Sequence, residues 1–167
     1  MTASRRMLLL SGPNLGALGR RQPEVYGTET LDEHVAAARA EAASLGYELD
    51  HVQSNHEGDL IDAVHGASGG DRSADAIIVN AGALTHTSWA LHDALASFDG
   101  VSVELHLSNP AAREPFRHTS VLAPVVGGSI AGLGGLGYPL AVVAAHRLLS
   151  ARSAESSAEG PSAGDPG

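Results

Sequence analysis

The sequence predicts an α/β fold in which parallel strands alternate with helices. Short apolar runs bounded by turn residues recur along the chain, and residues 76–79 form a continuous run typical of a strand covered on both faces. Between these runs, apolar residues recur at helical spacing. Alternation of this kind requires right-handed crossovers, so it favours a parallel sheet. Five strands of this size indicate a flavodoxin-like three-layer sandwich with a five-stranded parallel sheet in the order 2-1-3-4-5.

Individual elements follow from the same patterns. Strands are expected at residues 7–10, 47–54, 76–79, 101–107 and 121–126, and helices at residues 30–45, 59–67, 87–97 and 139–150. Thr30 and Glu33 have the spacing of a capping box at the start of the first helix, and Gly46 is a natural stop. Pro139 fits the first turn of the last helix. Residues 1–150 are therefore expected to form a single domain, and residues 151–167, rich in serine, alanine and glycine, a disordered C-terminal tail.

Composition excludes several classes of enzyme. The chain of 167 residues is long enough for one domain with a proper core but contains no cysteine, which excludes disulfides, thiolate nucleophiles and cysteine-based metal sites. All ten basic residues are arginine. Without lysine, Schiff-base catalysis, pyridoxal-phosphate chemistry and the phosphate-binding lysine of a P-loop are excluded.

The charge and the apolar segments indicate a cytoplasmic protein. A net charge of −9 argues against nucleic acid or an anionic membrane as a partner, because both select basic surfaces. Arg5 and Arg6 precede an apolar run of four residues, which is too short for a signal peptide. No segment approaches transmembrane length.

The connection of residues 11–28 is the first candidate for function. A connection this long without regular structure is usually a functional lid or a disordered segment. It contains Arg21 and, five residues later, Tyr26. Ionising a free tyrosine at neutral pH costs about 4 kcal/mol, and a neighbouring cation typically offsets about 1.4–4 kcal/mol of that cost. The alternatives are an activated phenolate base and a flexible loop with solvated arginines, and this segment alone does not separate them.

Polar residues follow three predicted strands that are neighbours in the expected order. Asn14 follows the first strand, Asn80 and His86 follow the third, and His106 and Ser108 end the fourth. Ligands bind outside the carboxyl ends of open parallel sheets at the point where strand order reverses. We therefore expect these side chains to converge on one crevice.

Glu104 and His106 lie two residues apart in a strand and point to the same face. A carboxylate beside an imidazole orients the ring and favours its protonated form, as a general acid requires. A buried pair with only a structural role is the alternative. Arg113 and Arg117 follow beside the same crevice and favour an anionic or polyhydroxylated substrate, although each is singly also compatible with a solvated surface residue.

Three other sequence patterns are weaker evidence for function. The glycines of Gly132-Leu133-Gly134-Gly135-Leu136-Gly137 have dinucleotide-fingerprint spacing, but no strand follows them and the motif is not early in a βαβ unit. No histidines have a recognised metal-ligand spacing. Trp89 is interpreted as a packing or interface residue. The histidines expected at the surface are His34, His51, His65 and His146.

Several separated motifs resemble those of the type II 3-dehydroquinate dehydratases, or type II dehydroquinases, from about Met7 to Leu149. They are SGPNLGALGRRQPEVYG, QSNHEGDLID, VNAGALTHTS, VELHLSNPAAREPFRH and GLGGLGY. The resemblance implies the flavodoxin-like fold, a homododecamer built as a tetramer of trimers, and no metal or organic cofactor. The missing lysine is consistent with it, because the unrelated type I enzymes use a lysine Schiff base.

The resemblance also implies roles for individual residues in an anti elimination of water that converts 3-dehydroquinate into 3-dehydroshikimate. Tyr26 would remove a proton from C2, and Arg21 would favour the ionised phenol. Asn14 would stabilise the resulting enolate through an ordered water. His106 would protonate the departing C1 hydroxyl, with Glu104 holding the imidazole.

The other implied roles concern substrate binding. They are Asn80, His86 and Arg117 with the ring hydroxyls, the backbone of Leu107 and Ser108 with the carboxylate, Arg113 as a second cation near the phenol, and Asp93 from a neighbouring subunit. The sequence departs from the family pattern at Ser11, where asparagine is usual, at Val121, where tyrosine is common, and at Leu136, where glutamine is common. None of these is a catalytic position, but the last two bear on packing or subunit contacts.

Two other functions are compatible with the predicted fold. One is a non-catalytic binder of a polyhydroxylated carboxylic acid that uses the same crevice. The other is a flavin or nucleotide protein, which rests on fold analogy alone. The enzyme is favoured because a binder needs neither an activated phenol nor a Glu–His acid.

Overall fold

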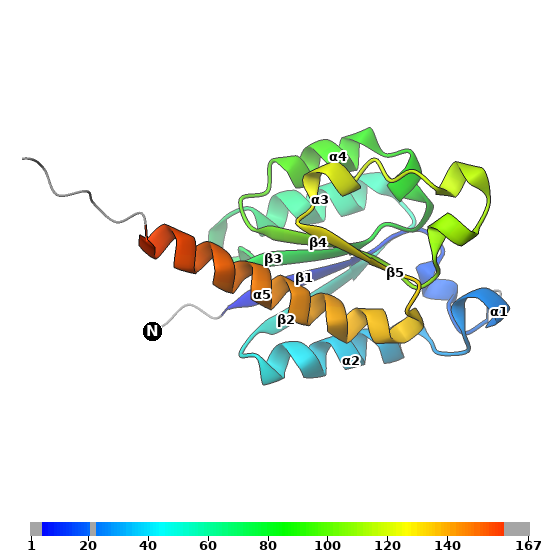
Figure 1. The fold of residues 1–167 in the computed structure, drawn as a ribbon, viewed down its shortest axis with the longest axis horizontal. Coiled ribbons are helices and arrows are strands. Elements are labelled where there is room, and N and C mark those ends of the chain that lie inside the picture. The colour runs from blue at the N-terminus through cyan, green and yellow to red at the C-terminus, as the bar shows by residue number, and fades with distance from the viewer. Residues whose placement is uncertain (1–4, 21–22, 159–167) are drawn as a thin grey trace, which may run out of the picture.

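The computed structural model describes residues 5–20 and 23–158. Its centre is a parallel sheet in the order β2-β1-β3-β4-β5 (Figure 1). The five strands are β1 (Arg6–Ser11), β2 (Glu48–Gln53), β3 (Ala76–Asn80), β4 (Val101–His106) and β5 (Gly128–Ala131). The predicted α/β, flavodoxin-like sandwich and its strand order are confirmed.

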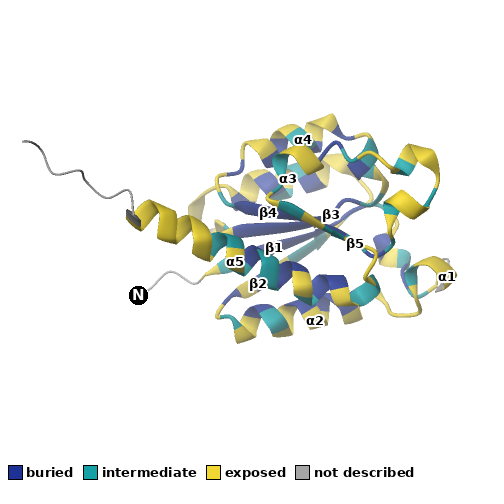
Figure 2. Cartoon of the chain, in the orientation of Figure 1, coloured by how far each residue is buried: buried dark blue, intermediate teal, exposed yellow. Residues whose placement is uncertain are grey.

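Helices cover both faces of the sheet and give the three layers. They are α2 (Leu31–Ser44), α3 (Glu57–Ala67), α4 (Trp89–Ala96) and α5 (Gly137–Ala158), whereas the single-turn α1 (Pro23–Tyr26) lies beyond the end of the sheet (Figure 1). Helices α2 and α5 pack on one face, where Leu9 and Val35 belong to the same core, and α3 and α4 pack on the other, where Leu10 and Leu60 do (Figure 1). The central strands β1, β3 and β4 are buried, whereas the edge strands β2 and β5 are partly exposed, as are the outer sides of the helices (Figure 2).

The first long helix begins where the capping box was predicted. The Thr30 hydroxyl accepts from the Glu33 backbone N–H at 3.3 Å, and the Glu33 carboxylate accepts from the Thr30 N–H at 2.7 Å. Gly46 follows the helix with a φ of 81°, a left-handed conformation that glycine adopts without steric cost. This end of α2 leads directly into β2.

The register of the central strands brings distant segments together at the carboxyl edge. Ser11 of β1 pairs with Asn80 of β3, and Val79 of β3 pairs with Glu104 of β4. Residues just beyond these pairs therefore emerge at the same edge. This is the convergence expected from the strand order.

The fifth strand is not where the sequence predicted it. Val121 and Leu122 are buried in the core on the side of α4, and the His92 Nδ1 donates to the Val121 carbonyl at 2.7 Å. A 3-10 turn (Ala123–Val125) follows, and its Pro124 has no N–H for a ladder. The apolar run at residues 121–126 thus packs under a helix, and the strand that pairs with β4 lies at Gly128–Ala131.

The last helix is longer than predicted. It ends at Ala158 instead of residue 150, so residues 151–158 of the predicted tail are helical. Extending an existing helix requires no new nucleation, and the alanine, arginine and glutamate of this segment are good helix formers. Arg152 also donates to the Asp99 carbonyl at 2.8 Å. Residues 159–167 lie outside the described part of the chain.

Two further expectations are corrected. The connection of residues 11–28 contains a 3-10 turn (Leu15–Ala17) and the single-turn α1. His34 is 2% exposed and stacks on Tyr138, with 4.9 Å between ring centroids, because it faces the core side of α2. His51 and His146 are half-buried, whereas His65 is exposed as expected.

Within residues 5–20 and 23–158, no helix combines the length and apolar character needed to cross a bilayer.

Candidate active site

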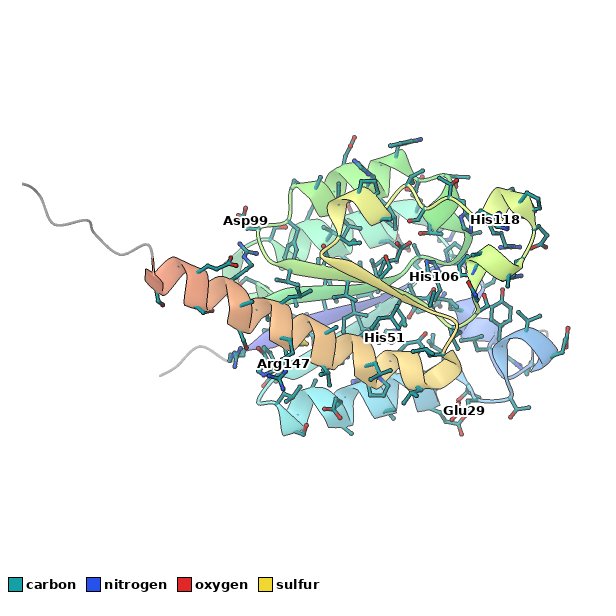
Figure 3. All side chains as sticks on the ribbon, in the orientation of Figure 1. Glu29, His51, Asp99, His106, His118 and Arg147 are labelled. Carbon is teal, nitrogen blue, oxygen red and sulfur yellow. The ribbon has the colours of Figure 1, made fainter. Side chains whose placement is uncertain are left out.

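A cavity of about 90 Å³ opens at the carboxyl edge of the sheet. It lies between the segments that follow β1, β3 and β4. Figure 3 places His106 at the end of the sheet that faces α1. The predicted site residues that line the cavity are Asn14, Tyr26, Asn80, His86, His106, Leu107, Ser108, Arg113 and Arg117.

The imidazole of His106 is held by the buried carboxylate of Glu104. Its Nε2 lies 2.9 Å from Glu104 Oε1, and the Glu104 side chain is 1% exposed. Because Nε2 donates to the carboxylate, Nδ1 is the nitrogen left to face the cavity. Burial by itself would raise the pKa of Glu104, but hydrogen bonds from His106, Thr85 and Ser120 outweigh it and the net pKa is lowered. Glu104 is therefore an ionised partner for His106.

Three hydroxyls complete the environment of this carboxylate. Thr85 donates to Oε1, Ser120 lies 2.8 Å from Oε1 and 3.0 Å from Oε2, and Ser129 donates to Oε2 at 3.1 Å. A buried charge is tolerated only when it is paired and hydrogen-bonded. Glu104 meets this condition with donors from three separate segments of the chain.

The phenol of Tyr26 meets a guanidinium across the cavity. Arg113 Nη1 donates to the Tyr26 hydroxyl at 2.8 Å and to Ser108 Oγ at 3.2 Å. The guanidinium carbon also lies 5.4 Å from the centre of the Tyr26 ring. Arg21, the other arginine predicted beside this phenol, lies outside the described residues.

Asn14 occupies a turn that the neighbouring loop supports. Its φ of 68° makes it the single non-glycine residue with positive φ in the described part of the chain. The Asn14 backbone N–H donates to Asn55 Oδ1 at 2.9 Å, and Gln53 donates to the same oxygen at 3.3 Å. An asparagine tolerates the left-handed conformation better than most residues, and here the conformation turns Asn14 to the cavity.

Asn80 and His86 are held by partners behind the cavity. Asn80 is 2% exposed, and its amide donates to the Tyr138 hydroxyl at 3.4 Å. Burial raises the pKa of Tyr138 to about 12, so this hydroxyl remains protonated. His86 Nδ1 donates to the Thr119 carbonyl at 2.7 Å, which leaves Nε2 as an acceptor for a ligand hydroxyl.

Of the two remaining predicted site residues, one lines the cavity and the other does not. Arg117 lines the cavity and its Nε donates to Glu114 at 2.7 Å. Asp93 is exposed on α4 and is not among the lining residues of the single chain.

Among the described residues, no group of three or more histidine, aspartate or glutamate side chains is arranged to hold a metal ion.

Comparison with known proteins identifies the family. The model of the family Dehydroquinase class II matches residues 5–146. The chain belongs to the class II dehydroquinase family.

Relatives and solved structures agree with the family match. The 3-dehydroquinate dehydratase of Roseiflexus castenholzii is 58% identical over 137 residues, which cover 82% of this chain and 85% of that protein. A protein of the same name from Vibrio cholerae is 50% identical over 152 residues, covering 91% of this chain and 99% of that protein. The crystal structure of type II dehydroquinase from Butyrivibrio crossotus matches with a TM-score of 0.81 at 40% identity, covering 84% of this chain and 97% of that chain.

This family member carries the two groups that an elimination needs on one cavity. A phenolate stabilised by a guanidinium can accept a proton from carbon, and an imidazolium supported by a carboxylate can protonate a leaving hydroxyl. Tyr26 and His106 both line the cavity, so one substrate can contact both.

Sequence reasoning missed the residues that support the site from behind. Thr85, Ser120 and Ser129 contact Glu104, Asn55 supports Asn14, and Tyr138 contacts Asn80. One signal was available, because a buried carboxylate on a central strand needs donors and hydroxyl residues occur in ALTHTS and RHTS. Ser129 gave no such signal, because the sequence placed the fifth strand at residues 121–126 and not at Gly128–Ala131.

Proposed function

We propose that this protein catalyses the dehydration of 3-dehydroquinate to 3-dehydroshikimate. The single observation that carries the proposal is that the Tyr26–Arg113 pair and the Glu104–His106 pair meet at one cavity. Membership of the class II dehydroquinase family supports the same reaction. The reaction breaks one C–H and one C–O bond and releases water, so it requires no oxidant or reductant.

The first step is removal of the C2 proton by the Tyr26 phenolate. Arg113 stabilises the phenolate through the 2.8 Å hydrogen bond, and we assign Arg21 the same role from the loop. The electrons of the broken C–H bond form an enolate. Asn14 faces the cavity and stabilises this enolate through an ordered water.

The second step is loss of the C1 hydroxyl. His106 gives its proton to the departing oxygen, while Glu104 balances the imidazolium charge from 2.9 Å. The enolate electrons then form the new double bond, and water leaves. The base and the acid act from opposite sides of the ring, which makes the elimination anti.

Substrate binding uses the remaining polar groups of the cavity. We assign the ring hydroxyls to Asn80, His86 and Arg117, and the carboxylate to the backbone of Leu107 and Ser108. Asp93 contributes from a neighbouring subunit.

The proposal includes a homododecamer built from trimers and a cytoplasmic location. Two large side chains support association, because Trp89 is 63% exposed and Leu136 is 62% exposed in the single chain. Light scattering of the purified protein should give a mass twelve times that of one chain. A monomer would leave the Asp93 assignment without a basis.

The test of the activity is an absorbance assay. Adding 3-dehydroquinate should produce the ultraviolet absorbance of a conjugated enone, and Tyr26→Phe should abolish it. Tyr47→Phe is the matched control, because Tyr47 also lies under an arginine, with Arg5 at 4.1 Å from its ring centre, but does not line the cavity. Calorimetric binding without any enone would instead identify a non-catalytic binder.

A further inference from the structure

The carboxylate of Glu104 has one hydrogen-bond partner whose direction is fixed by the backbone. Ser120 Oγ accepts from the Leu122 N–H at 3.1 Å and from the Ala123 N–H at 3.0 Å. A hydroxyl oxygen has two lone pairs and one proton. With both lone pairs directed at N–H donors, Ser120 has only its proton left to offer. Thr85 Oγ1 lies 3.1 Å from Ser120 Oγ, but the Glu104 oxygens are closer, at 2.8 and 3.0 Å, and carry the negative charge, so the proton is assigned to Glu104.

The geometry at Glu104 agrees with this direction. Ser120 Oγ lies 2.8 Å from Oε1 and 3.0 Å from Oε2, so its proton sits between the two carboxylate oxygens. Protonation of Glu104 would require one of these oxygens to carry a hydrogen. Ser120 cannot turn round to accept that hydrogen without giving up a backbone N–H, so it favours the ionised carboxylate.

The segment that carries Ser120 is anchored by the residues that follow it. The next residue, Val121, donates its N–H to the Thr85 carbonyl at 2.8 Å and accepts from His92 at 2.7 Å. Val121 and Leu122 are buried. Ser120 is therefore held at Glu104 by contacts that do not involve a substrate.

We propose that Ser120 is a positioning residue for the general acid, an obligatory donor that keeps Glu104 ionised and His106 turned with Nδ1 to the cavity. It acts through Glu104, since it is not among the residues that line the cavity. Thr85 and Ser129 contribute to the same carboxylate, but the oxygen of neither is fixed by two backbone donors. This inference rests on the proposed dehydratase function.

A purely structural role for Ser120, as the cap of the turn at Leu122 and Ala123, makes a different prediction. Losing a cap would disturb the cavity whether or not His106 is present. Losing a donor to Glu104 matters for the acid step only while His106 is there to deliver a proton. The two roles are therefore separated by measuring Ser120→Ala in two backgrounds.

The experiment measures kcat and KM for the full-length protein and its variants by the enone assay. Ser120→Ala should lower kcat about tenfold to a hundredfold, the effect of losing one hydrogen bond to an ionised group, with KM nearly unchanged. In a His106→Asn background, the same change should have no further effect. The acid limb of kcat should also move to higher pH in Ser120→Ala, because a carboxylate with one donor fewer is protonated more easily.

Controls define the outcomes. Ser68→Ala removes a serine hydroxyl that donates to the Val64 carbonyl at 3.0 Å away from the cavity, and should leave kcat unchanged. Ser120→Thr keeps a hydroxyl and should retain most of the activity. If Ser120→Ala does not fold, Ser120→Cys replaces it, and its weakly donating thiol should give a kcat well below that of Ser120→Thr.

The inference is overturned if the wild-type protein is active but Ser120→Ala, or Ser120→Cys where it is used, keeps the kcat of Ser120→Thr. It is equally overturned if Ser120→Ala lowers kcat by the same factor with and without His106. An inactive wild-type protein would instead refute the proposed dehydratase function, so the two failures are distinguishable.

Discussion

Replacing Glu104 by glutamine would test the acid half of the site. The amide has nearly the size of the carboxylate but carries no charge. His106 would keep a neighbour at Nε2 while losing the anion that stabilises its protonated form. Ser120 and Thr85 would keep a carbonyl oxygen as one acceptor, so the variant should fold.

The size of the effect follows from the geometry. Two unit charges 2.9 Å apart attract by about 6 kcal/mol at an effective dielectric constant of roughly 20, before desolvation is subtracted. Removing one partner of a buried pair typically costs about 3–5 kcal/mol of folding stability, and we take the same loss for the imidazolium that donates the proton in the transition state. At about 1.36 kcal/mol per tenfold, this predicts a kcat lowered roughly 10²- to 10⁴-fold. KM should change little, because Glu104 is not a lining residue.

The assay is the enone absorbance at saturating 3-dehydroquinate, with circular dichroism to verify the fold. Glu48→Gln is the matched control, because it makes the same chemical change at an exposed residue at the start of β2. A folded Glu104→Gln protein that retained about a third of the wild-type kcat or more would refute the reasoning. A threefold loss corresponds to less than about 1 kcal/mol of transition-state stabilisation, whereas the pair is predicted to contribute about 3 kcal/mol or more.

Three other changes test the fold. Thr30→Ala removes the hydroxyl that accepts from Glu33 and should destabilise the protein by about 1 kcal/mol, measured as a lower urea midpoint. Gly12→Ala places a methyl group 2.4 Å from the Ala81 carbonyl oxygen, so it should lower the free energy of unfolding by about 2 kcal/mol or more, again measured as a lower urea midpoint. Burial lowers the pKa of His34 below 6.5, so its contribution to stability is present above pH 6.5 and is lost as the pH falls. His34→Phe should therefore flatten the fall of melting temperature on acidification, and an unchanged slope would contradict this.

The strands of the central sheet could be predicted because local pattern and tertiary role agree there. Residues 76–79 form a continuous apolar run and are buried on both faces. The run at residues 121–126 looks similar, yet Pro124 cannot pair and the run packs on the side of α4. The true β5, Gly128–Ala131, is short, and three of its four residues are small, so its pairing with β4 is decided by the rest of the fold.

Lone polar residues were harder to place than motifs. Glu104 and His106 were predicted as a pair because strand periodicity puts both on one face, and the structure brings them to 2.9 Å. His34 was expected at the surface because its side chain is polar. It nevertheless lies three residues after Leu31 and four before Ala38, on the buried face of α2, where Tyr138 of α5 covers it. Ser120 was missed because, outside its own turn, its partners Glu104 and Thr85 are 16 and 35 residues away in the sequence.

Four segments of the chain supply the hydrogen-bond donors around the Glu104 carboxylate, so a local distortion of any one of them also perturbs His106. Detachment of the edge strand β5, for example, would remove Ser129 and admit water while most helices stay intact. Turnover is then a more sensitive gauge of local opening than helix content. In a urea titration followed by both readings, catalysis should fade at a lower concentration than ellipticity does.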